Sequence, residues 1–134
     1  MEIIFWKNRE KEEIDPFLFS EHAEKLARRL ADECRNSREK QNKRTQLRKF
    51  YDEVVRLETA ARSSETDNWR TVLPMVHMLT AKAAYARGRE LISDSFLAFI
   101  KDSVSQTKEF KDLRVFTTFF EAVMGFYRQY GPNS

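Results

Sequence analysis

The chain has 134 residues, with 24 lysines and arginines against 21 aspartates and glutamates, and a net charge of +3. This length suits one domain with a hydrophobic core. The composition, 41% hydrophobic and 34% charged, excludes a disordered tail, and the apolar stretches are too short for a membrane span of about 18–20 residues. The lone cysteine, Cys34, excludes an intrachain disulfide, and the N-terminus does not resemble a secretory signal. We therefore expect a soluble, cytoplasmic protein.

Glycine and proline are scarce, with three of each, where average usage predicts about nine and seven. A β-sheet protein of this size needs more turn residues, whereas the abundant Ala, Leu, Glu, Lys and Arg favour helices. We predict an all-α fold, a single-domain bundle of about five helices. Residues 1–15 are predicted to be a weakly ordered N-terminal arm, with Phe5 and Trp6 as candidate anchors, and residues 16–134 to be the helical-bundle domain.

Two helices are expected in the first half of the domain. Ser20 can cap a helix over residues 20–35, and residues 36–43, which contain no apolar side chain, form a linker. Thr45 can cap a second helix, which the polar stretch Ser63–Asn68 ends. Apolar residues recur at helical spacing in both helices. In the first they are Ala23, Leu26, Ala27, Leu30 and Cys34, and in the second Leu47, Phe50, Tyr51, Val54, Leu57 and Ala61.

Three more helices follow. The third runs from near Trp69 to Arg87 and stops around Gly88, and Pro74 either kinks it or lies in the first turn of a helix that begins later. Ser93 or Asp94 caps a short fourth helix. The fifth spans Phe110–Tyr130 and ends at Gly131 and Pro132. The inward residues predicted for the third helix are Trp69, Val72, Leu73, Val76, Leu79, Ala83 and Ala86, and for the fourth Phe96, Leu97, Ile100 and Val104.

The fifth helix carries two apolar stripes. The first consists of Leu113, Phe116, Phe120, Val123 and Tyr127, and the second of Val115, Phe119, Ala122, Phe126 and Tyr130. A helix that is apolar over most of its circumference is either central in a bundle or shares one face with a partner.

Positive charge is concentrated in one segment. Residues 35–49 contain seven basic residues and one acidic residue, so the rest of the chain has a net charge of −3. This pattern indicates either a surface that meets a polyanion or a solvated loop between helices. On the third helix, Lys82, Tyr85 and Arg89 follow helical spacing and add cations around an aromatic ring. Such an arrangement can follow a nucleic-acid backbone through phosphate contacts, although helix-terminal cations also favour the helix dipole.

The sequence contains no recognisable catalytic or metal-binding pattern. His22 and His77 lack a second metal ligand at the usual spacing, and neither a glycine-rich phosphate loop nor a CxxC or HExxH motif is present. His77 is expected to be a core or boundary residue, and Cys34 a small core residue rather than a nucleophile. We therefore predict no enzymatic activity, no metal and no cofactor.

Three segments resemble one known family in the same order. Residues 43–54 (KRTQLRKFYDEV) resemble the "TSQLRKFY" opening of the small helical subunit of type III-A CRISPR effector (Csm) complexes. The string Ala84–Arg89 (AYARGR), with Lys82, is similar to that family's "KLAYAxGR" helix end. Residues 119–131 (FFEAVMGFYRQYG) are similar to its C-terminal "FFEAVVAYxxYYG". The resemblance covers about residues 43–131.

The resemblance implies a non-catalytic five-helix bundle, several copies of which stack along the complex. Its implied partners are target RNA, the guide–target duplex or single-stranded DNA, the guide-holding backbone subunit, the large subunit, and further copies of itself. Neighbouring copies are expected to meet through the second stripe of the fifth helix. Carried onto this chain, the RNA-binding residues are Lys43, Arg44, Arg48, Lys49, Lys82, Arg87, Arg89 and Arg128.

Two other functions fit the same residues. One is an adaptor bundle whose basic segment binds an acidic protein, in which case RNA would bind no better than any other polyanion. The other is a metal-dependent ribonuclease that assembles carboxylates from several helices.

Overall fold

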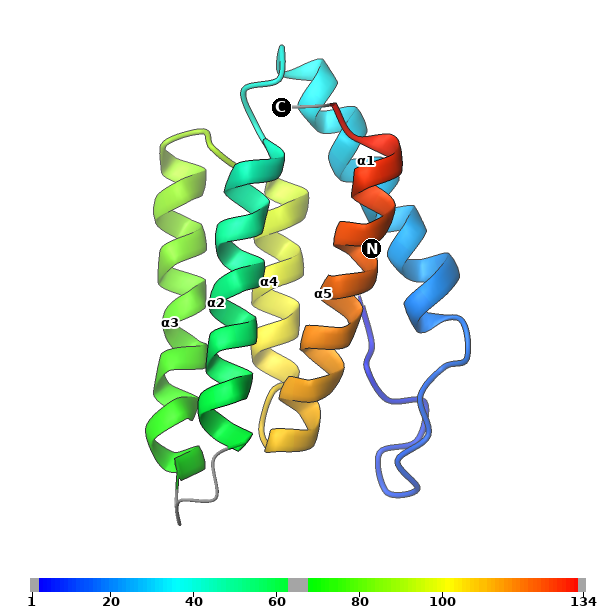
Figure 1. The fold of residues 1–134 in the computed structure, drawn as a ribbon, viewed down its shortest axis with the longest axis vertical. Helices are drawn as coiled ribbons and strands as arrows, with labels where there is room; N and C mark the ends of the chain where they lie inside the picture. Colours follow the sequence, from blue (N-terminus) through cyan, green and yellow to red (C-terminus); the bar gives the residue numbers. More distant parts are fainter. Residues whose placement is uncertain (1–2, 63–67, 133–134) are drawn as a thin grey trace.

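The computed structural model describes residues 3–62 and 68–132, and it is a helical bundle (Figure 1). This confirms the predicted all-α class, since the described residues contain only one isolated β-bridge, between Asn8 and Glu13. A short π-helix, η1, precedes the five α-helices. The bounds are η1 Leu18–His22, α1 Ala23–Asn36, α2 Arg44–Arg62, α3 Asn68–Gly88, α4 Asp94–Gln106 and α5 Phe110–Tyr130.

Helix α5 is central in the bundle, because it packs against both α1 and α2 (Figure 1). Its first stripe is completely buried. In the second stripe, Val115 and Phe119 are buried, whereas Ala122, Phe126 and Tyr130 are half-buried. Tyr130 packs on α1, where its hydroxyl lies 2.5 Å from a Glu24 carboxylate oxygen. Of the two interpretations of this helix, the central position is the one that the structure supports.

Phenylalanines of α4 and α5 form the middle of the core. The ring centroids of Phe99 and Phe120 lie 5.1 Å apart, nearly perpendicular, and those of Phe116 and Phe120 lie 6.2 Å apart in a stacked arrangement. Phe99 is missing from the predicted inward set of the fourth helix, which was wrong in this respect, and Leu97 is only half-buried. The reason is that α4 packs against α3 on one side, while Phe96 and Phe99 contact phenylalanines of α5 on the other, so the helix buries a wider face than one stripe.

Two predicted helix caps were wrong. Ser20 lies inside η1, and its hydroxyl donates to the Phe17 carbonyl instead of accepting from a first-turn amide. Thr45 lies inside α2, where the amides of Gln46 and Leu47 already bond to the Lys43 carbonyl. The Ser93 cap is confirmed, since its hydroxyl accepts from the Phe96 amide at 3.4 Å.

Helix α3 is continuous through Pro74, so the alternative of a later start was wrong. The proline lies on the exposed side of the helix, where water can bond to the Arg70 carbonyl that lacks its amide partner. His77 is exposed on the same side, and its prediction as a core or boundary residue was also wrong. The polar stretch Ser63–Asn68 was predicted to end the second helix, and its residues 63–67 lie outside the described part of the chain.

Residues 3–16 contain little regular secondary structure and are bonded to the end of α4 and the start of α5. The Phe5 side chain is fully buried, with its ring centroid 6.3 Å from that of Phe116. The Phe5 amide donates to the Gln106 side chain at 2.8 Å, and Gln106 donates back to the Ile3 carbonyl at 2.5 Å. Both ends of this amide side chain therefore bond the segment to the end of α4.

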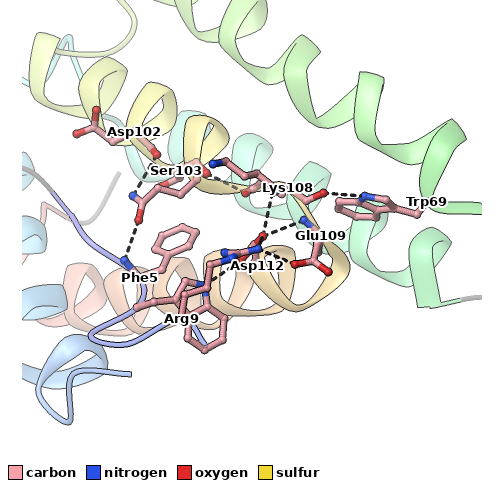
Figure 2. Close-up of polar contacts among 11 residues, drawn as sticks. Phe5, Arg9, Trp69, Asp102, Ser103, Lys108, Glu109 and Asp112 are labelled. Carbon is pink, nitrogen blue, oxygen red and sulfur yellow. Dashed lines mark hydrogen bonds and ion pairs between the residues drawn. The ribbon is translucent and has the colours of Figure 1, made fainter. Parts of the chain in front are cut away.

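Asp112, in the first turn of α5, is the second attachment point of this segment (Figure 2). Its carboxylate accepts from the Trp6 indole at 2.7 Å and from the Arg9 guanidinium at 2.5 and 2.9 Å. It also accepts from the backbone amides of Lys108 and Glu109 at 2.9 and 2.8 Å. One buried carboxylate thus holds both the start of α5 and the N-terminal segment.

Candidate nucleic-acid interface

The eight predicted RNA-binding residues lie toward one end of the bundle, where α2 begins and α3 and α5 end (Figure 1). This placement follows from the antiparallel order of the helices, which brings the basic linker beside the last turns of α3. The residues are Lys43, Arg44, Arg48 and Lys49 around the start of α2, Lys82, Arg87 and Arg89 around the end of α3, and Arg128 in the last turn of α5.

Three of these cations line one groove between α2 and α3. Lys49 projects from α2, and Lys82 and Arg89 come from the end of α3. The groove has a volume of about 380 Å³. Its floor is apolar, and the side chains of Gln46 and Glu53 add polar groups to its lining. The remaining lining residues are Phe50, Leu79, Tyr85, Ala86 and Leu91.

Glu53 places a negative charge inside this basic groove. Its carboxylate lies 3.3 Å from the Lys82 ammonium and accepts two bonds from Arg56, at 2.9 and 2.8 Å. The hydrogen bond from Arg56, followed by that from Lys82, lowers the pKa of Glu53 below its usual value, so the groove keeps this charge at neutral pH. Glu53 was not among the residues predicted from the sequence, because its relation to Lys82 depends on the register between α2 and α3.

Two further cations lie near the groove but outside its lining. Arg48 is exposed on α2 and forms an ion pair with Asp52 at 3.6 Å, a surface pair of the kind that contributes little to stability. Lys43 is exposed immediately before α2. Both side chains are accessible to a polyanion that runs along the start of this helix.

The last three predicted residues point to other parts of the surface. Arg87 pairs with Asp94 of α4 at 2.6 Å, and Arg128 is exposed on α5. Arg44 is half-buried, and its guanidinium donates to the Pro132 carbonyl at 3.2 Å. The structure therefore groups Lys49, Lys82 and Arg89 in one groove and separates Arg44, Arg87 and Arg128 from it.

Other kinds of site have little support in the structure. Within residues 3–62 and 68–132, no three His, Cys, Asp or Glu side chains are grouped so that they could hold a metal ion. Cys34 is buried, as predicted, and burial raises the pKa of its thiol. No helix in the described part of the chain has the length and hydropathy needed to cross a bilayer.

Comparison with known families decides the identity. The model of the Csm2 Type III-A family matches residues 17–133, which is most of the chain and includes all five α-helices. The chain belongs to the Csm2 family. It is thus a small subunit of the type III-A CRISPR (Csm) complex, as the resemblance of its three segments implied, and Csm2 is a structural rather than a known catalytic subunit of that complex. No match was found among curated proteins or solved structures.

Proposed function

We propose that this Csm2 subunit is a non-catalytic, cytoplasmic RNA-binding protein whose groove between α2 and α3 binds the sugar–phosphate backbone in the guide–target region. The observation that carries the proposal is the convergence of Lys49, Lys82 and Arg89, from two helices, on one groove. Cations spaced along a groove match the regular charge of a nucleic-acid strand. Arg48 and Lys43 extend the charge along α2. Sequence specificity would come from pairing between guide and target, since phosphate contacts do not read bases.

Several copies would stack along the complex beside the guide-holding and large subunits. The second stripe of α5 offers less surface for this contact than its sequence implies, because Val115 and Phe119 are already buried within the chain. Only Ala122, Phe126 and Tyr130 of that stripe keep some exposure. Contacts between copies would therefore involve the C-terminal half of α5.

The first test is the double variant Lys49→Glu/Arg89→Glu in RNA-binding titrations over a series of salt concentrations. Neither side chain forms an ion pair within the described residues, and the variant leaves the Glu53–Lys82 pair intact. For single-stranded RNA, the slope of log K against log salt concentration should become shallower by about 0.7 for each phosphate that the variant no longer binds. The affinity at about 0.1 M salt should fall roughly tenfold or more. The guide–target duplex should show the same direction of change.

The control is Arg114→Glu, which reverses one positive charge at the start of α5, outside the lining of the groove. It should keep most of the affinity and the salt dependence of the unmodified chain. An unchanged salt dependence in the groove variant would refute this phosphate site. Equal binding of heparin and RNA would favour the acidic-protein adaptor, and divalent-ion-dependent RNA cleavage would favour the ribonuclease.

A further inference from the structure

Tyr85 is the most exposed large hydrophobic residue in the described chain, with 66% of its surface accessible. It lies on the wall of the groove that contains Lys49, Lys82 and Arg89. The Arg89 guanidinium carbon is 5.8 Å from the centroid of the Tyr85 ring, and an Arg89 nitrogen donates to the Tyr85 hydroxyl at 3.3 Å. Arg89 thus holds the ring in place while leaving much of the tyrosine accessible to a ligand.

A surface that bound only phosphates would need neither this ring nor the apolar floor beneath it. Phe50, Leu79 and Leu91 form part of that floor, and the volume of about 380 Å³ lies within the range of small-molecule pockets, about 300–1,000 Å³. A flat, apolar group that carries hydrogen-bonding edges fits such a groove. Within a nucleic acid, that group is a base.

The charges of the groove favour different positions for the base and for the phosphates of a nucleotide. Glu53 is ionised and lies 3.3 Å from Lys82, so a phosphate deep in the groove would be repelled by its carboxylate. A base is neutral, and its N–H groups can donate to a carboxylate or to the Gln46 amide oxygen. Lys49 and Arg89 are more exposed than Glu53 and suit the phosphates on either side of that base.

We propose that the groove between α2 and α3 accepts one unstacked base of single-stranded RNA, which stacks on Tyr85 while Lys49 and Arg89 bind the flanking phosphates. This inference rests on the proposed RNA-binding function and specifies how the strand is held. Stacking on an aromatic side chain tolerates any base, since every base has a π face, and it is the usual way in which proteins bind unpaired nucleotides.

The test compares an oligouridylate with an abasic RNA of the same length, which has the same phosphates but no bases. Oligouridylate is chosen because its bases stack poorly on one another. The unmodified chain should bind oligouridylate about tenfold more tightly than the abasic strand, the scale of one base on one aromatic ring. Tyr85→Ala should remove this difference and leave the salt dependence unchanged. Tyr85→Phe should retain the difference, because the ring is preserved.

The outcomes separate this inference from the function on which it rests. If the unmodified chain binds both RNAs equally and with the same salt dependence, the base site is refuted and the phosphate groove stands. If Tyr85→Ala weakens binding of both RNAs to the same extent, Tyr85 acts only by orienting Arg89, and stacking is refuted. If the unmodified chain binds neither RNA, the proposed function and the base site fail together.

Discussion

Asp112→Ala is expected to lower the free energy of unfolding by about 2–4 kcal/mol, as measured by urea denaturation. The Asp112 side chain is completely buried and accepts hydrogen bonds from Trp6, Arg9 and the amides of Lys108 and Glu109. Alanine would leave these buried donors without their acceptor and would remove one half of the capping box of α5. The same change would remove the second of the two attachment points of the N-terminal segment.

Arg9→Ala is the matched comparison for this prediction. The Arg9 side chain is about one third exposed, so in Arg9→Ala water can take the place of part of the guanidinium as a hydrogen-bond donor to Asp112. Arg9→Ala should therefore be clearly less destabilised than Asp112→Ala. Phe5 and Gln106 would still hold the segment in that variant. Equal stability of Asp112→Ala and the unmodified chain would show that the carboxylate does not support the fold.

The same carboxylate predicts a loss of stability in acid. Burial alone would raise the pKa of Asp112, but the hydrogen bonds from Arg9, from two backbone amides and from Trp6 outweigh it and lower the pKa from 3.8 to about 2. A pKa below that of the unfolded chain stabilises the fold above about pH 4, and this contribution disappears as the pH falls toward 2. It amounts to about 2 kcal/mol. Urea titrations between these pH values should show that the free energy of unfolding falls as the pH is lowered. In Asp112→Ala, the free energy of unfolding should fall less over the same pH range.

The helices were largely predictable because local residues determine them. Helix α5 occupies its predicted span, since its apolar periodicity is strong and Gly131 and Pro132 follow it. The starts of α1 and α2 were less predictable, because Ser20 and Thr45 are suitable caps by residue type but lie inside helical turns. Whether a hydroxyl caps a helix depends on where the backbone begins to coil, which tertiary packing decides.

The candidate site was predictable in its charges but not in its geometry. The basic residues around the start of α2 and the end of α3 can be read from the sequence, and Lys49, Lys82 and Arg89 do share a groove. Their spacing could not reveal that Arg87 pairs with Asp94 instead, or that Glu53 lies among the cations. Those relations depend on how α2, α3 and α4 are rotated against one another, which no local pattern specifies.

The Asn42 side chain, just before α2, bonds to α1 and to the N-cap of α4, and Asn42→Ala is expected to lower the free energy of unfolding by about 3–5 kcal/mol. Its buried amide donates to the Leu30 carbonyl at 3.2 Å and to the Ser93 hydroxyl at 2.9 Å, and it accepts from the Ser93 amide at 2.9 Å. Its backbone has a φ of 60°, which asparagine tolerates better than alanine. Alanine would therefore lose three buried hydrogen bonds and strain the backbone.

Asn42→Gly separates the loss of the hydrogen bonds from the backbone strain, because glycine adopts the positive φ without strain but also lacks the amide side chain. It should be more stable than Asn42→Ala by about 1 kcal/mol in urea denaturation and less stable than the unmodified chain. Equal stability of the two variants would refute the backbone contribution.

The Asn42 backbone amide also donates to the carbonyl of Leu91, which lines the groove, at 3.0 Å. Both variants should consequently bind RNA more weakly even where they remain folded, because Asn42 connects the start of α2 to the segment that follows α3.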